Sequence, residues 1–242
     1  MGGAAREETV TYDIVIPHFG RSEALAASVL RCLSSIAKHS EDYRVILVDN
    51  GSTCGVEAVH HALRQLPHML IRNSENLGFV KATNQGLAYS NAPFVILMNN
   101  DTEAAPGWLE KLCEPFRYDA LVGISGPLTT AAACWQGKYP GPRDGFAVLP
   151  PGRMLAFFCS MLSRKCLAKV GRLDEDFGVG FGDDDNYCLR AERAGFRLAL
   201  VRSLTIPHAH RTTFREVYGA EAIPAMQEAA LELFHRKRRE GR

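Results

Sequence analysis

The stretch Val95-Ile96-Leu97-Met98-Asn99-Asn100-Asp101-Thr102 decides the fold that we predict for this chain. Its first half is an apolar run that follows Pro93-Phe94, and such a run between turn formers is typical of a strand buried in a parallel sheet. Its second half puts one carboxylate and neutral polar side chains at the carboxyl end of that strand. Ligands of open α/β sheets bind at this edge, so the stretch predicts a ligand site as well as a strand.

Asp101 has two interpretations at this point. It can cap a helix that begins near Trp108, as can Thr102. Alternatively, it is a hard ligand for a divalent cation that also holds phosphate oxygens. Caps are far commoner than metal sites, so the stretch by itself favours the cap, and the rest of the chain has to decide.

The first hundred residues alternate strands with helices around this stretch. We expect buried strands at Asp13–Pro17, Val45–Asp49 and Met69–Ile71, and helices after Ser22, over Val56–Leu66 and over Phe79–Tyr89. Loops rich in Asp, Asn and Gly follow the strand ends, which is typical of a parallel, doubly wound sheet. The chain has no Gly-x-Gly-x-x-Gly after its first strand and no P-loop, so neither of those nucleotide sites is supported.

The second half is less regular, and we expect it to complete one α/β domain over residues 12–235. Helices are expected at Trp108–Phe116, Arg164–Val170, Asp183–Ala194 and Ala220–His235, and strands at Leu121–Ser125, Met154–Leu162 and Arg197–Val201. Residues 129–151 are predicted to form a long loop over one face, and loops of this length are usually functional or disordered. Residues 1–11 are expected to be a disordered lead-in, and residues 236–242 a basic tail.

Composition narrows the class of protein. The net charge is +1 over 242 residues, which gives no field that would attract nucleic acid. The 7 cysteines are scattered without a Cys-x-x-Cys pair, which argues for a reducing compartment and against a disulfide framework or a zinc site. With no signal core and no apolar run of membrane length, we expect a cytoplasmic protein. The basic tail is expected to be solvated, with peripheral contact to anionic lipid at the inner face of the membrane as the alternative.

Asp183, Asp184 and Asp185 form an acidic run at the start of a predicted helix. One carboxylate there is explained by the helix dipole, but three neighbouring carboxylates repel one another. Apolar bulk from Phe177 and Phe181 would raise the pKa of a carboxyl group and suit it to proton abstraction. We therefore favour a functional role for this run over simple capping.

Four other polar positions are ambiguous when each is taken alone. His208 and His210 follow a strand-like segment, and are either ordinary polar residues or metal ligands beside the carboxylates. Asp49 can merely stabilise the turn that follows it. Asn76 can merely belong to a helix entry.

Taken in order, several segments resemble the family 2 glycosyltransferases, in particular their rhamnosyltransferase-like branch. The matching segments are Ile14–Pro17, Val48–Thr53, Asn76–Phe79, Asn84–Gly86, Leu97–Thr102, Gly171–Phe177, Asp183–Arg190, and His208 with Thr213–Phe214. The resemblance implies a single Rossmann-like, A-type domain with a mostly parallel central sheet flanked by helices. It also implies metal-dependent, inverting transfer of a sugar from a UDP- or dTDP-sugar to a hydroxyl acceptor. That acceptor would be a glycan, a lipid-linked molecule or a protein, in glycan, polysaccharide or glycoconjugate biosynthesis.

The resemblance also implies a set of nucleotide-sugar-binding residues: Pro17, Asp49, Asn50, Asn76, Gly78, Asn84, Asn99 and Asn100. Within this set, Asp49 would hold the nucleotide base, and the segment from Asn76 to Asn84 would line the diphosphate and ribose. The donor would lie in residues 12–101, and the acceptor and catalytic groups in residues 102–214, followed by a C-terminal helix at 215–235. His18-Phe19-Gly20 departs from the Tyr-Asn that the family often has after the first proline.

The implied metal is Mn²⁺ or Mg²⁺, held by Asp101 and His208, with His210 as the fallback ligand. Asn99 replaces the first carboxylate of the family's Asp-x-Asp motif. Asp184 would be the general base, with Asp183 in place of the family's Glu. The three consecutive aspartates leave this assignment ambiguous by one position.

Two other classes of function stay open. A nucleotidyltransferase would need a Gly-rich, basic loop after the first strand, and His18-Phe19-Gly20-Arg21 is only a weak version of one. A non-catalytic sugar-nucleotide-binding module would be expected to have lost Asp101, the acidic run or His208, and all three are present.

Overall fold

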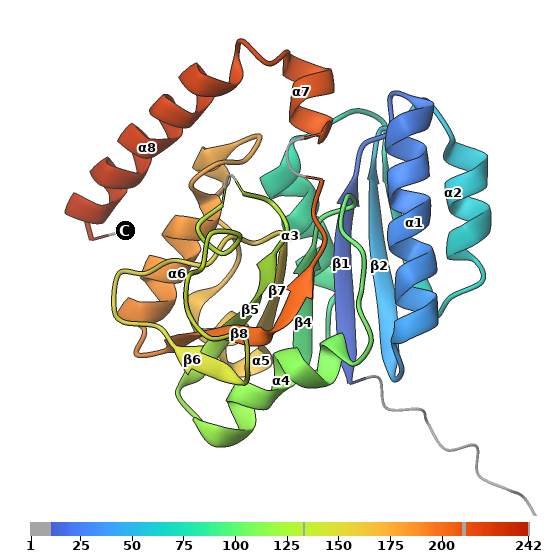
Figure 1. Cartoon of the computed structure of the whole chain (residues 1–242). Coiled ribbons are helices and arrows are strands. Elements are labelled where there is room, and N and C mark those ends of the chain that lie inside the picture. The colour runs from blue at the N-terminus through green and yellow to red at the C-terminus, as the bar shows by residue number, and fades with distance from the viewer. Residues whose placement is uncertain (1–10, 133, 210–211, 242) are drawn as a thin grey trace, which may run out of the picture.

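The computed structural model describes residues 11–132, 134–209 and 212–241, which form one α/β domain (Figure 1). Its strands are β1 (Tyr12–His18), β2 (Tyr43–Asn50), β3 (His68–Asn73), β4 (Phe94–Met98), β5 (Val122–Thr129), β6 (Phe146–Val148), β7 (Cys159–Ser163) and β8 (Arg197–Ile206). Its α-helices are α1 (Glu23–His39), α2 (Val56–Leu63), α3 (Phe79–Tyr89), α4 (Trp108–Tyr118), α5 (Arg164–Val170), α6 (Asp183–Arg193), α7 (Thr212–Tyr218) and α8 (Ile223–Arg239). A 3₁₀ turn, η1 (Glu175–Phe177), precedes α6. Residues 1–10 of the expected disordered lead-in lie outside the described part of the chain, as does His210, the fallback metal ligand.

All eight strands form one sheet in the order β3-β2-β1-β4-β7-β5-β8-β6. Strands β3, β2, β1 and β4 are parallel, as are β5 and β8, whereas β7 runs antiparallel between β4 and β5. The register places His18 beside Asp49 and Asn50 beside Asn73, so polar strand ends meet at one edge. The predicted fold class, a mostly parallel sheet flanked by helices, is confirmed.

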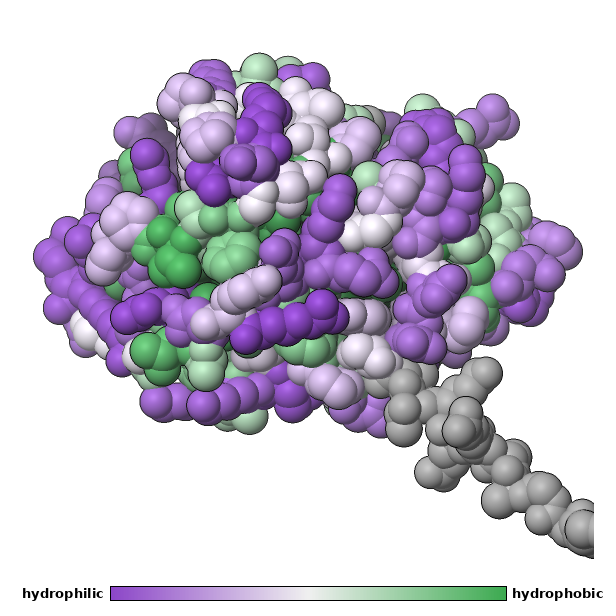
Figure 2. Space-filling model, turned by 60° about the horizontal axis from the view of Figure 1, so that its bottom comes forward, coloured by the Kyte–Doolittle hydropathy of each residue, from purple (hydrophilic) through white to green (hydrophobic). Residues whose placement is uncertain are grey.

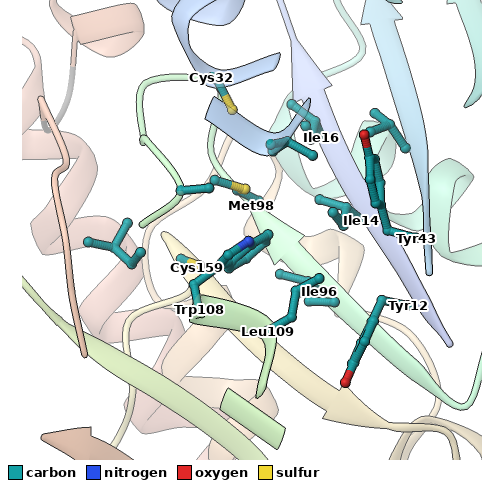
Figure 3. Packing of buried hydrophobic residues seen from close by; sticks show 14 of the residues in the cluster. Tyr12, Ile14, Ile16, Cys32, Tyr43, Ile96, Met98, Trp108, Leu109 and Cys159 are labelled. Atoms are coloured by element: carbon teal, nitrogen blue, oxygen red, sulfur yellow. The ribbon is translucent and has the colours of Figure 1, made fainter. Parts of the chain in front are cut away.

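Helices cover both faces of the sheet, and this explains why its central strands read as unbroken apolar runs. Ile14 and Ile16 of β1 pack into a core with α1, α2 and α4, and Figure 3 shows Trp108 beside Met98, Cys159 and Ile96 in that core. Val15, between them in sequence, packs on the opposite face with α3, α5 and α6. Alternate residues of one strand thus fill two cores.

Helix α3 lies so close to the sheet that one of its residues has to be glycine. A Cβ atom added at Gly86 would lie 2.4 Å from Val15 Cγ1 and 3.3 Å from Val48 Cγ2. Glycine normally weakens the interior of a helix. Here it lets the helix settle onto β1 and β2 and so fixes the position of the helix start at Phe79, beside the polar strand ends.

Two predicted elements of the second half are wrong in extent. The strand expected over Met154–Leu162 covers only Cys159–Ser163, because the backbone before it bonds to side chains and not to a neighbouring strand. The N–H of Ala156 donates to Gln136 Oε1 (2.8 Å), and that of Leu155 to Cys188 Sγ (3.5 Å). The loop expected over residues 129–151 contains strand β6, which pairs with β8.

The C-terminal helix α8 is longer than expected and continues through Arg239. The residues expected as a solvated basic tail therefore extend this helix, and Lys237 is only 2% exposed. Its ammonium group pairs with Asp174 (2.6 Å) and Asp176 (2.5 Å), next to η1. In the described part of the chain, no helix combines the length and apolar character needed to cross a bilayer.

Candidate active site

A cavity of about 730 Å³ opens at the carboxyl edge of the sheet, within the size range of ligand-binding pockets. Most of the site residues predicted from sequence line it: Pro17, Asn50, Asn76, Gly78, Asn99, Asn100, Asp101, Asp183, Asp184 and His208. Asp49 and Asn84 are not among the lining residues. The fold thus gathers ten predicted residues from distant parts of the sequence into one cavity.

Asp101 and His208 lie side by side although they are far apart in the chain. Asp101 Oδ1 is 3.2 Å from His208 Nε2, and both side chains are 7% exposed. The backbone holds the two segments together, because Thr102 and His208 form an isolated antiparallel bridge and Ala209 N donates to Asp101 O (3.1 Å). The His208 ring also stacks on Phe158, with 5.1 Å between ring centroids. The pair is therefore a preformed feature of the fold.

The atoms around this pair suit a divalent cation. Asn99 Nδ2 lies 3.3 Å from His208 Nε2, while Asn99 Oδ1 is buried and has no hydrogen-bond partner among the described residues. Carboxylate, imidazole and amide groups are ligands that Mn²⁺ and Mg²⁺ accept. No group of three His, Cys, Asp or Glu side chains able to hold a metal occurs within the described ranges. The site is consistent with a divalent metal cofactor that takes its remaining ligands from a phosphate-bearing ligand.

Asn50 organises the loop that forms the next part of the cavity. Its Nδ2 donates to Asn76 Oδ1 (2.8 Å), and its Oδ1 accepts from the N–H of Leu77 (3.1 Å). Gly78 has φ +87°, and a Cβ there would lie 3.0 Å from Gly178 O. Only glycine suits this left-handed backbone at such a close approach. The loop is thereby held against the Gly-rich segment that leads to the aspartate run.

Asp49 does not line the cavity and is 1% exposed. Its carboxylate accepts from the N–H of Ser52 (2.9 Å) and contacts His60 Nε2 (3.0 Å) and Arg72 Nη1 (2.6 Å). Burial alone would raise the pKa of Asp49, but the Ser52 and His60 hydrogen bonds and the Arg72 charge hold it below its ordinary value. In this structure Asp49 is an ionised anchor for the turn that carries Asn50.

Asn84 likewise supports the site from outside the cavity. Its amide accepts from Leu173 N (3.0 Å) and donates to Leu173 O (2.9 Å) and Glu175 Oε1 (3.0 Å). Both ends of the amide are therefore bonded to the segment around η1. Asn84 ties α3 to the chain that leads into the aspartate run, and this explains its burial at 3% exposure.

His18 is a cavity residue whose role was not predicted. The imidazole is 2% exposed, and Asn100 Nδ2 donates to its Nδ1 (2.9 Å), which joins the ends of β1 and β4. Burial lowers the pKa of His18 to about 4, so the ring is neutral at pH 7. The sequence feature that could have indicated a role in the site is its position directly after Pro17, at the end of the first strand.

The aspartate run begins α6, and all three of its residues line the cavity. Asp184 Oδ1 accepts from the N–H of Asp185 (2.9 Å), and Asp184 Oδ2 from the N–H of Phe157 (3.4 Å). Burial raises the pKa of Asp183 to about 6. Burial, and then the neighbouring charges of Asp183 and Asp185, raise the pKa of Asp184 well above its ordinary value. A carboxylate in such surroundings is a competent proton acceptor near neutral pH.

Hydrophobic side chains form another part of the cavity lining. We call this surface the apolar wall, and it consists of Phe181, Phe214, Val217, Tyr218, Leu231 and Phe234. It comes from the loop before α6 and from helices α7 and α8, which lie along the top and upper left of Figure 1. Residues 215–235 were expected to form one C-terminal helix; the structure has two helices there, and neither was predicted to line the site.

Open α/β sheets bind their ligands outside the carboxyl ends of the strands, which is where this cavity lies. The chain belongs to Glycosyl transferase family 2, whose sequence model matches residues 13–171, more than half of the chain. The match includes Asn99–Asp101 and ends before Asp183–Asp185 and His208. The family match does not cover these last residues, and only the cavity that they line places them with the others.

The chain is 29% identical over 202 residues to a pre-mycofactocin glycosyltransferase of Mycobacterium tuberculosis, covering 75% of this chain and 42% of that protein. It thus spans less than half the length of this relative. Among solved structures, it resembles the mannosyltransferase PcManGT of Pyrobaculum calidifontis in complex with GDP-Man and Mn²⁺ (TM-score 0.65, 16% identity, 82% of this chain and 56% of that chain). It also resembles GalNAc-T7 with UDP, GalNAc and Mn²⁺ (TM-score 0.64, 15% identity, 84% and 44% coverage). At these identities the structural likeness concerns the fold.

Proposed function

We propose that this protein is a metal-dependent, inverting glycosyltransferase that moves a sugar from a nucleoside-diphosphate sugar to a hydroxyl group of an acceptor. One observation carries the proposal. The Asp101–His208 pair and the carboxyl group of Asp184 line the same cavity, so a leaving diphosphate and a reacting hydroxyl can be handled together. Membership in Glycosyl transferase family 2 supports the same reaction class.

The donor would lie against the strand ends. Asn76 and Asn100 supply neutral amide groups there, which suit the hydroxyls of ribose and sugar, and Asn50 positions Asn76. Asp101 and His208, with Asn99 beside them, would hold Mn²⁺ or Mg²⁺. When bound, the cation supplies charge neutralisation for the diphosphate that leaves.

Asp184 would act as the general base. Its carboxylate takes the proton of the acceptor hydroxyl as that oxygen forms a bond to the anomeric carbon of the sugar. The bond from the anomeric carbon to the diphosphate oxygen breaks on the opposite side, and the nucleoside diphosphate leaves with the electron pair. A single displacement inverts the anomeric configuration and requires no protein nucleophile.

The donors named for the structural neighbours support this class of donor but differ in their base. GDP-Man is bound to the mannosyltransferase, and UDP and GalNAc to GalNAc-T7, each with Mn²⁺. Uridine, thymidine and guanosine diphosphate sugars are therefore the donors to test.

A thermal-shift screen of UDP-, dTDP- and GDP-sugars with and without Mn²⁺ tests the proposal, because a ligand that binds only the folded protein raises its Tm. We expect one donor class to raise Tm, and to do so by more in the presence of Mn²⁺. Release of nucleoside diphosphate from that donor should then require Mn²⁺. The absence of any metal-dependent shift across the three donor classes would overturn the proposal.

A further inference from the structure

The apolar wall lines the same cavity as the strand ends, the Asp101–His208 pair and the aspartate run. Its Phe181 stands two residues before Asp183 in the sequence. With the donor on the strand ends, as proposed above, an acceptor hydroxyl that reaches Asp184 therefore lies beside this wall. The character of this wall therefore bears on which acceptor fits.

The wall carries no charged side chain among the described lining residues of α7 and α8. The polar lining residues of α7 and α8 are only Thr213, Tyr218 and Gln227 among those described, and the wall itself is mostly aromatic and aliphatic. Leu231 lines the cavity and is still 53% exposed, so the hydrophobic surface continues to the cavity mouth. By contrast, the face seen in Figure 2 is dominated by hydrophilic residues.

Phe181 is held beside the aspartate run in an unfavourable backbone conformation. Its φ is +69°, a region that non-glycine residues rarely adopt. Its ring packs against Phe214 with 4.6 Å between centroids, and a Cβ at Gly180 would lie 3.0 Å from Phe214 Cζ. Such strain persists where the surroundings enforce it, and it is concentrated at functional sites. Here it holds a phenyl ring two residues from Asp183.

We propose that the acceptor presents its hydroxyl on an uncharged alkyl or aryl group that packs on the apolar wall. This inference rests on the proposed function, because it assigns the acceptor side of the same cavity. A glycan would bury several hydroxyls here with few partners, and each polar group buried without a hydrogen bond is unfavourable. An alkyl or aryl group gains from the same burial.

The test uses one substitution in the wall and one matched substitution outside it. Leu231→Glu places a charge at the mouth of the wall, on a side chain exposed enough to tolerate it. Leu121→Glu makes the same change at a residue that is 47% exposed and does not line the cavity. Phe181→Gly is a second wall variant, since glycine adopts φ +69° without strain.

Two readouts are measured on each protein. The first is binding of the uncharged fluorophore N-phenyl-1-naphthylamine and its displacement by hexyl or methyl β-glucoside. The second is binding of UDP or GDP with Mn²⁺ by calorimetry. We expect at least tenfold weaker fluorophore binding in Leu231→Glu and Phe181→Gly, wild-type binding in Leu121→Glu, and displacement by the hexyl glucoside at a concentration at least tenfold lower than by the methyl glucoside.

Equal fluorophore binding by wild type and both wall variants, or equal displacement by the two glucosides, would overturn the inference. The proposed function is judged separately by the nucleotide measurement. Metal-dependent nucleotide binding that survives in the wall variants leaves the proposed function standing whatever the fluorophore does. If the wild type binds neither UDP nor GDP in the presence of Mn²⁺, the proposed function is refuted, even if the wall binds apolar molecules.

Discussion

Lys237 Nζ lies 2.6 Å from Asp174 Oδ2, which fastens the C-terminal helix to the segment just before the aspartate run. Asp176 is a second partner of the same ammonium group, at 2.5 Å. Phe234, one turn earlier on α8, is buried in the core beneath α6 and lines the apolar wall. Helix α8 is thus an integral wall of the site and not an appendage.

We expect Lys237→Met to lower the free energy of unfolding by about 1–3 kcal/mol, as is usual when hydrogen bonds to charged groups are removed. The methionine keeps most of the buried stem but leaves Asp174 and Asp176 without their cation. Urea denaturation measures the change. Arg236→Met is the matched control on an exposed face of the same helix, and a similar loss in that variant would contradict the role given to Lys237.

Asp184→Asn should reduce kcat by roughly 10²–10⁴-fold, the usual contribution of a positioned general base. Binding of the nucleoside diphosphate with Mn²⁺ should stay within twofold of wild type, because the proposed metal ligands are Asp101 and His208 and not Asp184. Steady-state kinetics and calorimetry give the two values. Asp185→Asn serves as the comparison, and a larger loss of kcat there than in Asp184→Asn would move the base by one position.

Asp101→Ala should abolish the Mn²⁺ dependence of nucleotide binding, because the site then loses its one carboxylate. We expect at least tenfold weaker binding of UDP or GDP in the presence of Mn²⁺, and little change in its absence. Calorimetry with and without Mn²⁺ distinguishes these cases. His208→Ala should act in the same direction, and an unaltered Mn²⁺ effect in both variants would rule out this metal site.

Asp183→Asn should stabilise the protein at neutral pH. Burial raises the pKa of Asp183 to about 6 in the folded state, above its ordinary value of 3.8. A carboxyl group of this kind favours folding at low pH, and its contribution is lost as the pH rises from about 3.8 to about 6. At pH 7 the ionised Asp183 lowers the free energy of unfolding by up to about 3 kcal/mol, and the substitution by Asn removes this penalty. Thermal denaturation should show a higher Tm than wild type at pH 7.5 and a difference near zero at pH 3.5; equal gains at both pH values would contradict the assignment.

Gly86→Ala should destabilise the protein by about 1–3 kcal/mol, the range for overpacked cores, although alanine is the better helix former. The added Cβ would lie 2.4 Å from Val15 Cγ1, so helix or strand has to shift. In a Val15→Ala background the clash is removed, and Gly86→Ala should become neutral or stabilising. Denaturant unfolding of the four proteins gives the coupling, and additive effects would argue against close packing at this point.

The parallel half of the sheet could be predicted because both of its faces are covered. Burial on two sides gives β1, β2 and β4 continuous apolar runs, and polar residues follow each run. Strand β7 was placed imprecisely for a related reason. Leu155 and Phe157 are as buried as the strand that follows them, but their backbone partners are distant side chains that no local pattern reveals.

The candidate site could be predicted as a set of residues but not as a set of contacts. Asp49 was correctly placed at a strand end, yet its partner Arg72 is set by the register of β2 on β3, which places the two residues side by side. Asn84 was grouped with the donor residues, while its amide bonds to a segment that is distant in sequence. The apolar wall was not predicted as a surface, because Phe214, Val217 and Tyr218 lie on a helix of only 7 residues, too short for its apolar spacing to stand out in the sequence.

Strand β7 pairs with β4 along one edge and with β5 along the other, and so interleaves the two halves of the chain. Everything up to β5 comes before the long connection at residues 130–145, and β7 and β8 come after it. A protease cut in that connection would therefore leave two fragments that still share an unbroken sheet. The two segments on either side of this connection are therefore parts of one mechanical unit.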